Sequence, residues 1–280
     1  MTDFSALNEK TISFIGGGNM ARAIIDGLLK AKHEHHLTLN LGVSDSDPSK
    51  LDEFIAKGLS AVSPDDAKQI IEGADVVVLA VKPQVMRDVA GSIAPYLNEQ
   101  IVLSIAAGLS VDTLSDMLGG YRNIVRCMPN LPASQGFGAS GLYASNSSEA
   151  ARLMTQNIMQ ASGMVSWVED ESLLHAVTAV AGSAPAYFFY VLENMIAKAV
   201  EMGLSPEDAH ALAVQSMRGA AALAKDQDPA TLREQVTSKG GTTAAALDCL
   251  YRDDVGGAFA RAMQACSDRS FELGQMLSES

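Results

Sequence analysis

Along the first part of the chain, short apolar runs alternate with stretches of helical periodicity. The apolar runs predict β-strands over 10–15, 39–44, 75–81, 101–104, 123–128 and 140–144. The periodic stretches between them predict helices, for example over 20–31, 48–57 and 64–72. The run ADVVVLAV (74–81) is apolar at nearly every position, as expected for a strand covered on both faces. Strands and helices alternating in this way predict βαβ units and a parallel sheet.

The pattern changes near residues 167–170, where the strand signals stop. Helical periodicity then predicts helices over 173–180, 184–202, 206–225, 229–237, 243–251 and 255–277. Ser205-Pro206 and Asp228-Pro229 each have the form of an N-cap followed by proline in the first turn. We therefore expect an α/β domain over residues 1–169 and an all-α domain over residues 170–280.

The predicted helix over 184–202 is unusual in its polarity. Its sequence, APAYFFYVLENMIAKAVEM, is apolar around most of the helix circumference, so the helix needs cover on more than one side. The neighbouring predicted helices are too few to supply that cover within one chain. We therefore predict an intertwined homodimer through the helical half. The alternative is a monomeric bundle with this helix at its centre.

A glycine-rich turn lies between the first predicted strand and the first predicted helix. In TISFIGGGNMARAIIDGLL, Gly16, Gly18 and Ala21 fit the pattern G-x-G-x-x-G/A. Gly16 allows the tight turn, Gly18 lets the backbone approach a pyrophosphate, and Ala21 keeps the helix close to its strand. The start of the helix would direct free N–H groups at the anion. The pattern predicts a Rossmann-type dinucleotide-binding domain, against the alternative of a plain glycine turn.

The end of the second predicted strand, VSDSDPSK, should lie near the adenosine ribose of such a dinucleotide. Asp45 has two interpretations. It either accepts hydrogen bonds from the ribose 2′-OH, which favours NAD over NADP, or it caps the helix that starts at Pro48. Asp47 fits the capping role as well. The loop contains no arginine to bind a 2′-phosphate.

The formal net charge of −13 and a pI near 4.7 argue against a nucleic-acid partner. An anionic cofactor would then depend on the positive ends of helix dipoles. The polar start MTDFSALNEK does not resemble a signal peptide, and the longest apolar run, Ala74 to Val81, is too short to span a membrane. We therefore expect a cytoplasmic protein with no membrane partner.

Nothing in the sequence indicates a metal site. Cys127, Cys249 and Cys266 have no paired spacing, which predicts small, buried, reduced thiols. The histidines between the first helix and the second strand have no cysteine or carboxylate partner at useful spacing, so a solvated loop is expected there.

Five further segments follow one another in a characteristic order. They are AVKP (80–83), SIAAG (104–108), RCMPN (126–130), AGSAPAY (181–187) and SKGGTT (238–243). With the glycine turn, this series resembles the pyrroline-5-carboxylate reductase family from the first strand almost to the C-terminus. The resemblance implies reduction of the cyclic imine 1-pyrroline-5-carboxylate to L-proline, the last step of proline biosynthesis. The usual family cofactor is NADPH, with NADH as the other possibility. Family members are dimers through the helical half and often assemble further, commonly into decamers.

The resemblance also implies the residues of the site. The segment 15–20 would cradle the pyrophosphate, 80–83 and 106–107 would flank the ribose and nicotinamide, and 238–243 would hold the substrate. Thr243 would act as the catalytic residue, facing the imine nitrogen. The substrate-binding residues are Ser238, Gly240, Gly241, Thr242 and Thr243. The cofactor-binding residues, including those at the end of the second strand, are Ile15, Gly16, Gly17, Gly18, Asn19, Met20, Ser44, Asp45, Ala80, Val81, Lys82, Pro83, Ala106 and Ala107.

The chain departs from the family pattern at three places. Leu131 and Lys239 stand where the family often has threonine and proline. Asp45-Ser46 stands where many members have Asn-Arg. This last change bears directly on the usual preference for NADPH.

The residues by themselves point to the same chemistry. Gly240-Gly241, followed by a helix, forms a second glycine-rich helix start suited to a carboxylate; a plain turn with a threonine cap is the alternative. Imine reduction needs orientation, worth up to ~7–11 kcal/mol, and a hydrogen bond at nitrogen. A β-hydroxyacid dehydrogenase, the nearest rival enzyme, needs a lysine four residues before an asparagine on the first long helix. Tyr190 stands at that place before Asn194. An imine reductase that acts on a different ring is another enzyme alternative, and a dinucleotide sensor without turnover is the alternative that is not an enzyme.

Overall fold

The computed structural model describes residues 3–278, and within that range the chain divides into two units. Unit 1 comprises the chain up to Ser183 and again from Cys266, and unit 2 comprises Ala184–Ala265. The last helix therefore begins in unit 2 and ends in unit 1. The division expected from the sequence, at 169/170, is a different one and stays a prediction.

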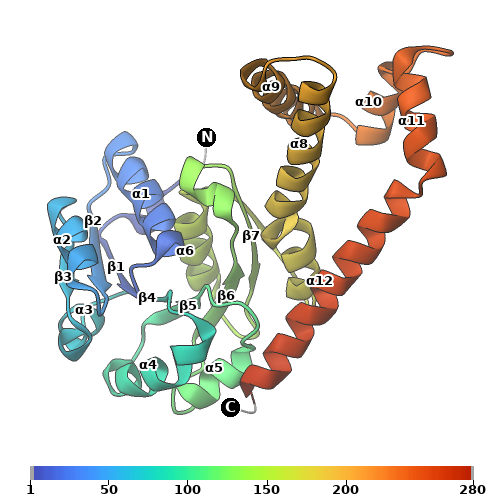
Figure 1. Ribbon diagram of the computed structural model, residues 1–280. Helices are drawn as coiled ribbons and strands as arrows, with labels where there is room; N and C mark the ends of the chain where they lie inside the picture. The colour runs from blue at the N-terminus through green and yellow to red at the C-terminus, as the bar shows by residue number, and fades with distance from the viewer. Residues whose placement is uncertain (1–2, 279–280) are drawn as a thin grey trace. The chain divides into compact units, whose positions relative to one another are not determined.

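Unit 1 is built on one sheet, shown in Figure 1. Its described strands follow the order β3-β2-β1-β4-β5-β6-β7-β8. Strand β7 runs antiparallel to β6, and all other neighbours are parallel. The order 3-2-1-4-5-6 is that of the doubly wound dinucleotide-binding fold, so the α/β prediction is confirmed. The strands are β1 Lys10–Ile15, β2 Leu39–Ser44, β3 Ser60–Val62, β4 Val76–Leu79, β5 Ile101–Ser104, β6 Ile124–Met128, β7 Gly138–Tyr143 and β8 Gly163–Trp167.

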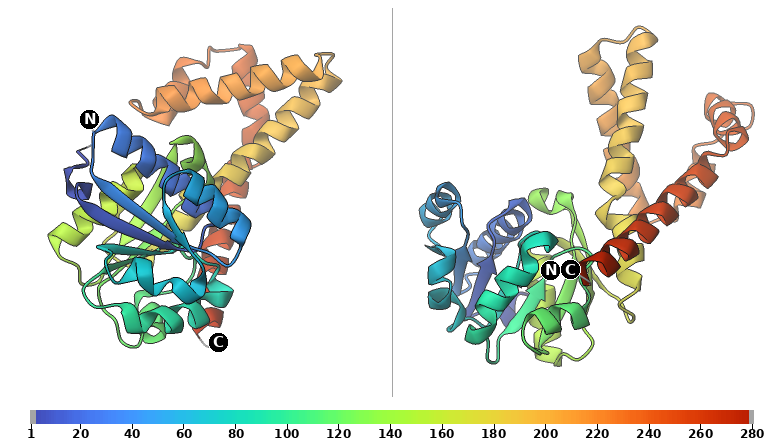
Figure 2. Two further views of the ribbon diagram at one scale, coloured as in Figure 1. Left: turned by 90° about the vertical axis from the view of Figure 1, so that its left-hand side faces the viewer. Right: turned by 60° about the horizontal axis from the view of Figure 1, so that its bottom comes forward.

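Helices cover both faces of this sheet, as Figures 1 and 2 show. One face packs against α1 (Asn19–Glu34), α2 (Pro48–Ala56) and α6 (Glu149–Gln160). The other packs against α3 (Lys68–Ile71), α4 (Met86–Ile93) and α5 (Val111–Met117). Strand β4 shows the consequence of being covered twice. Val76 and Val78 enter the first core, Val77 and Leu79 enter the second, and all four are fully buried. The continuous apolar run predicted this.

Short helical turns complete unit 1. They are η1 Ser5–Leu7, η2 Pro64–Asp66, η3 Pro83–Val85, η4 Ala94–Tyr96, η5 Leu131–Gln135, α7 Leu173–Val177 and the π-helical η6 Thr178–Gly182. The stretch 64–72, predicted as one helix, is divided into η2 and α3. Strands β3 and β8 were not predicted. The first has only three residues, and the second lies at the sheet edge and carries glycine and serine among its apolar residues, so neither has a clear periodic signal.

Unit 2 is helical. Ser205 accepts a hydrogen bond from the Asp208 N–H, and Asp228 accepts one from the Thr231 N–H, so both predicted N-caps are confirmed. Gly203, with φ of +105°, follows the end of α8 as a left-handed residue. The helices are α8 Ala184–Glu201, α9 Pro206–Ala224, α10 Pro229–Gln235, α11 Thr242–Arg252 and α12 Val255–Ser278, whose last part belongs to unit 1.

Helix α8 carries most of its apolar side chains on the surface of the single chain. Ala184 is the only buried residue among its described positions, whereas Phe188, Phe189 and Tyr190 are 53%, 57% and 68% exposed. The continuous helical stretch Leu173–Glu201 contains an 18-residue segment of mean hydropathy 1.2, so it is long and apolar enough to cross a membrane by length and composition. The same two properties are found in helices that are covered by other protein surfaces, so they do not by themselves indicate a membrane span.

Candidate active site

The glycine turn after β1 has a conformation that only glycine tolerates at its first position. Gly16 has φ of +102°, and a Cβ atom there would lie 2.7 Å from the carbonyl oxygen of Ala80. The Gly16 N–H donates to the Ser44 carbonyl at 2.7 Å, which ties the turn to the end of β2. The carboxyl ends of β1, β2 and β4 therefore meet at this turn, where a doubly wound fold places its ligand.

Helix α1 starts directly behind the turn and leaves its first N–H groups open. Its N-cap is Gly18, no side chain caps it, and its first turn contains no acidic residue. A Cβ atom at Gly18 would meet nothing within 4 Å, so space adjoins the helix start. An uncapped start of a 16-residue helix beside open space suits an anionic pyrophosphate, so the residues present fit a dinucleotide.

A cavity of about 440 Å³, here called the dinucleotide groove, opens at this place. Its lining contains one carboxylate, that of Asp45, and two ammonium groups, those of Lys50 and Lys82. The groove thus has a positive balance in a chain of net charge −13, which supplements the helix dipole expected from the sequence. The lining residues are Ile15, Gly16, Gly18, Ser44, Asp45, Ser46, Lys50, Pro64, Ala67, Ala80, Val81, Lys82, Val85, Val89, Ser92 and Ile93.

The other predicted cofactor residues do not line the groove. Gly17 is buried beneath the turn, where a Cβ atom would lie 2.6 Å from the Phe54 ring. The remaining ones are Asn19 and Met20 in the first turn of α1, Pro83 at the start of η3, and Ala106 and Ala107 after β5. Which of all these residues contact a cofactor stays a prediction.

The structure separates the two roles that were open for the acidic residues after β2. Asp47 caps α2, because its side chain accepts from the Ser49 N–H at 3.0 Å. Asp45 instead accepts from the N–H groups of Gly17 at 2.7 Å and Asp47 at 2.9 Å. Burial by itself raises the pKa of Asp45, but these two hydrogen bonds and the nearby Lys50 together hold its pKa below the ordinary value. Asp45 is therefore an ionised residue of the groove and not a helix cap.

Lys50 is the charged residue of the groove lining that the sequence interpretation missed. Its Nζ lies 3.1 Å from Asp45 Oδ2 and 3.2 Å from Oδ1. The loop 45–47 contains no cation, whereas Lys50 is the third residue of α2. A lysine in the first turn of the helix after this strand is a signal that could have been used, because that turn lies beside the strand end.

The second glycine-rich helix start, in unit 2, is also uncapped. Gly240 has φ of +72°, and Gly241 is the N-cap of α11 with no side-chain hydrogen bond. A Cβ atom at Gly241 would lie 2.4 Å from Ser238 Oγ and 3.1 Å from the Ser238 carbonyl oxygen, so a larger residue there would require Ser238 to shift. Because Gly241 and not a threonine occupies the N-cap position, the alternative of a threonine cap is wrong. Thr242 and Thr243 open the helix, and the side chain of Thr243 is half-buried.

Two of the characteristic segments are joined by a buried asparagine within unit 1. Asn130 is 7% exposed, and its Nδ2 donates to the Ala181 carbonyl at 3.1 Å. Its Oδ1 accepts from the Ala139 N–H at 2.9 Å. Asn130 thus holds the RCMPN segment against the start of AGSAPAY. The sequence identified both segments but not this contact, because it depends on the packing of β7 beside β6.

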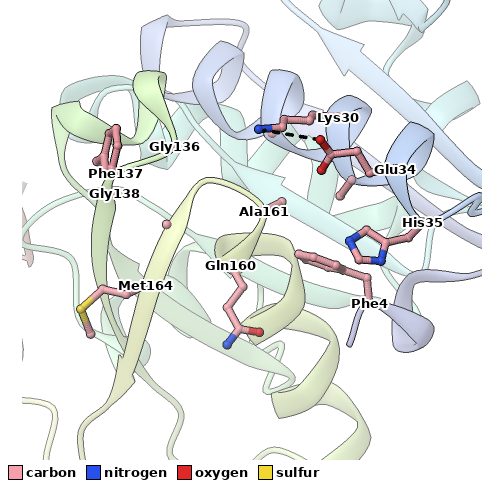
Figure 3. Close-up of a pocket in the computed structure, with 13 residues that line it drawn as sticks. Phe4, Lys30, Glu34, His35, Gly136, Phe137, Gly138, Gln160, Ala161 and Met164 are labelled. Atoms are coloured by element: carbon pink, nitrogen blue, oxygen red, sulfur yellow. Dashed lines mark ion pairs between the residues drawn. The ribbon is translucent and has the colours of Figure 1, made fainter. Parts of the chain in front are cut away.

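A larger cavity, of about 780 Å³, lies at the other end of α1 and is shown in Figure 3. Phe4, Lys30, Glu34 and His35 line one part of it, and Phe137 and Met164 line another. Its only ion pair among the residues drawn is the long contact of 3.9 Å between Lys30 and Glu34. A ligand in a doubly wound sheet binds at the carboxyl ends of the strands, which lie at the opposite end of α1. This cavity is therefore not the dinucleotide site.

The described residues 3–278 contain no group of three or more histidine, cysteine or acidic side chains that could hold a metal ion. Cys127 is buried as predicted, and burial raises the pKa of its thiol to about 12. For Cys249 the prediction of burial is wrong. It lies exposed on α11, where the sequence pattern left open which helix face is covered within one chain. Cys266 is partly buried.

The Rossmann topology, the uncapped helix start and the cationic groove together define a dinucleotide-binding protein. Residues 11–108 match the family described as "NADP oxidoreductase coenzyme F420-dependent". Residues 171–273 match the family described as "Pyrroline-5-carboxylate reductase dimerisation".

Relatives that match over nearly the whole chain identify the family to which it belongs. The chain is 42% identical to pyrroline-5-carboxylate reductase of Haemophilus influenzae over 272 residues, covering 95% of this chain and 98% of the relative. It is 40% identical to that of Pseudomonas aeruginosa, covering 98% and 100%. The chain therefore belongs to the pyrroline-5-carboxylate reductase family, and it is an oxidoreductase of proline biosynthesis that acts on a CH–NH group.

Solved structures of pyrroline-5-carboxylate reductases have the same fold as this chain. The pyrroline-5-carboxylate reductase of Coxiella burnetii superposes with a TM-score of 0.87 at 37% identity, covering 95% of this chain and 99% of that one. The NADP-bound Plasmodium falciparum pyrroline carboxylate reductase gives 0.82 at 26% identity, covering 96% and 99%. A 3-hydroxyisobutyrate dehydrogenase of Mycobacterium tuberculosis, from the rival class, gives 0.50 at 15% identity, which reflects the fold alone. The matched dimerisation family, over residues that include α8, confirms the homodimer.

Proposed function

We propose that this enzyme reduces 1-pyrroline-5-carboxylate to L-proline with NADPH as its preferred reductant, and that the dinucleotide groove binds the cofactor and the segment 238–243 binds the substrate. The observation that carries the proposal is the presence of two uncapped, glycine-rich helix starts, at Gly18 and Gly241, in a chain of this family. Each start presents backbone N–H groups to an anion. One anion is the cofactor pyrophosphate, and the other is the substrate carboxylate.

The dinucleotide groove would orient the cofactor. The open N–H groups of α1 bind the pyrophosphate, and the ammonium groups of Lys50 and Lys82 lower the cost of bringing an anion to an acidic protein. When bound, the dinucleotide supplies the hydride. The protein contributes chiefly by holding the two reactants in a productive orientation, an effect worth up to ~7–11 kcal/mol. The segments 80–83 and 106–107 are the residues proposed to hold the ribose and the nicotinamide.

The segment 238–243 would orient the imine. The start of α11 holds the carboxylate, and the hydroxyl of Thr243 forms a hydrogen bond at the ring nitrogen. A hydroxyl can do this without changing its charge, and a protonated imine needs no further acid to become electrophilic. The residue at the position of the hydroxyacid dehydrogenase lysine is Tyr190, whose carbonyl accepts from Asn194 Nδ2 at 2.7 Å. Asn194 is thus engaged in its own helix, which favours the imine over a hydroxyacid.

The assembly and the cell compartment belong to the same proposal. The dimer would associate further, with a decamer as the expected form, and the enzyme would work in the cytoplasm. Three cysteines without a disulfide among them fit a reducing compartment. Light scattering of the purified protein and fractionation of cells that express it would test these two points.

The direct test of the site is Thr243→Ala beside Thr243→Ser. Removing the hydroxyl should lower kcat for pyrroline-5-carboxylate about tenfold, the effect of one hydrogen bond at the reacting atom. The serine variant should keep most of the turnover, and the Kd of NADPH, measured by titration, should not change in either variant. Full turnover in Thr243→Ala would show that the substrate site is misplaced. Faster oxidation of a β-hydroxyacid than of proline by the wild type would overturn the reaction itself.

A further inference from the structure

The carboxylate of Asp45 is fully engaged within the protein. A carboxylate offers about four lone-pair positions for hydrogen bonds. In Asp45 they receive the Gly17 N–H, the Asp47 N–H and the Lys50 ammonium, which lies within 3.2 Å of both oxygens. The side chain is only 10% exposed. Little acceptor capacity is left for a ligand.

This arrangement changes how the acidic residue after β2 affects the choice between NADH and NADPH. Such a residue favours NADH when its oxygens are free to accept the ribose hydroxyls. Here a ribose hydroxyl would have to displace a charge-assisted bond to the glycine turn, to α2 or to Lys50. Asp45 instead holds the turn, the start of α2 and the Lys50 side chain together. It is a positioning residue.

Lys50 has the properties of the ligand-binding partner. Its side chain is 31% exposed and lines the dinucleotide groove together with the exposed Ser46. An ammonium group has three N–H donors, so the pairing with Asp45 leaves capacity for another acceptor. The pairing also cancels the Asp45 charge, which would otherwise repel a phosphate group.

We propose that Lys50, oriented by Asp45, is the residue that recognises the 2′-phosphate of NADPH in this enzyme, with the Ser46 hydroxyl as a second donor. The inference rests on the proposed cofactor groove and deepens it. The cation that many family members carry in the loop after the second strand is supplied here by the first turn of the following helix. The enzyme therefore selects NADPH although its loop carries an aspartate.

The experiment compares ligands that differ only in the 2′-phosphate. Isothermal titration of the full-length protein measures Kd for NADPH and NADH, and for the fragments adenosine 2′,5′-bisphosphate and 5′-AMP. In Lys50→Met, NADPH and the bisphosphate should bind about tenfold or more weakly, as for a lost charge-assisted contact. NADH and 5′-AMP should stay within about twofold. Lys50→Arg should restore most of the difference.

Lys57→Met is the matched control. Lys57 follows the same helix, is 30% exposed and pairs with Asp26 and Glu53, but it does not line the groove. It should leave all four affinities unchanged. Thermal unfolding of each variant shows whether it is folded. If Lys50→Met does not fold, the affinities of Lys50→Arg for the four ligands provide the test.

Two outcomes would overturn the inference. Equal weakening of phosphorylated and unphosphorylated ligands in Lys50→Met would make Lys50 a structural residue. Tighter binding of NADH than NADPH by the wild type would make Asp45 a ribose acceptor. Because these titrations contain no imine, their outcome does not depend on which reaction the enzyme catalyses. A protein that binds as expected but does not reduce pyrroline-5-carboxylate would contradict only the proposed function.

Discussion

The two units of this chain use apolar residues in opposite ways. Unit 1 encloses its large side chains, and Phe14 and Phe54 are completely buried in its core. Unit 2 leaves comparable side chains on its surface, with Phe188 and Phe189 more than half exposed. Both regions are rich in hydrophobic residues, so composition does not explain the difference. What differs is whether a second layer of the same chain is present to cover them.

The difference shows which part of the enzyme is complete as a single chain. A parallel sheet with helices on both faces closes its own core, whereas a few long helices cannot cover a helix that is apolar all round. Burying one such phenylalanine is worth about 1.5–3 kcal/mol, so the exposed residues of α8 represent a large driving force for association. We therefore expect dimer formation to contribute to the stability of unit 2.

The largest expected effect comes from charging the exposed surface of α8. The double variant Phe188→Glu/Phe189→Glu should dissociate the dimer and lower turnover about a hundredfold or more, because a misplaced substrate segment loses its orientation. Ile55→Glu is the control, since Ile55 is 55% exposed on α2 of unit 1. It should remain dimeric and active. Sedimentation velocity measures the association state, and steady-state kinetics measure the turnover. An intact dimer in the double variant would contradict the conclusion that the exposed side chains of α8 need a partner to cover them.

The second test asks whether unit 1 keeps its own function. All groove residues lie in unit 1, so the dissociated variant should bind NADPH within about threefold of the wild type.

Gly16→Ala should weaken NADPH binding about tenfold or more even in an intact dimer, since its Cβ has no room beside Ala80. Gly58→Ala is the control. It has a similar φ of +83° but open space, so it should cost only about 1–2 kcal/mol of stability and leave NADPH binding unchanged.

The smallest expected effect concerns the end of α12, which belongs to unit 1. His175 Nδ1 lies 2.9 Å from Ser270 Oγ, and its ring packs edge-on against Phe271. Burial, and then the charge of Arg126, lower the pKa of His175 below its ordinary 6.5, while Glu171 opposes them. The unfolded chain therefore binds the proton first as the pH falls. The contribution of His175 to stability is complete above about pH 6.5 and is lost as the pH drops through its folded-state pKa.

His175→Gln should accordingly reduce the fall in Tm between pH 7.5 and pH 5.5 by about 1–2 °C, measured by thermal unfolding. His33→Gln, on the exposed end of α1, serves as the control and should leave the pH dependence as it is. An unchanged slope in His175→Gln would mean that the pKa of His175 does not differ between the folded and the unfolded chain, which would contradict this prediction.

Much of the fold could be predicted from the sequence because local patterns dictated it. The bounds of β1, β2 and β5 agree with the prediction, and both proline-marked helix starts in unit 2 carry the expected caps. The edge strand β8 could not be predicted, since pairing with β7 stabilises a segment that has no strand pattern of its own. For the candidate site, the sequence located both glycine-rich turns but missed Lys50, because its approach to Asp45 depends on how α2 follows β2.

By itself, the sequence determined the family, the order of elements and the position of the two glycine-rich turns, because glycine placement and apolar periodicity act over a few residues. Only the tertiary structure decided what Asp45 does and where the positive charge of the groove comes from. Those depend on distances between groups that different elements bring together, and a carboxylate has a different chemistry once its acceptor positions are filled. Helix α8 is a further example. Its apolar character can be predicted from the sequence, but which of its surfaces stays exposed for a partner depends on how the chain packs.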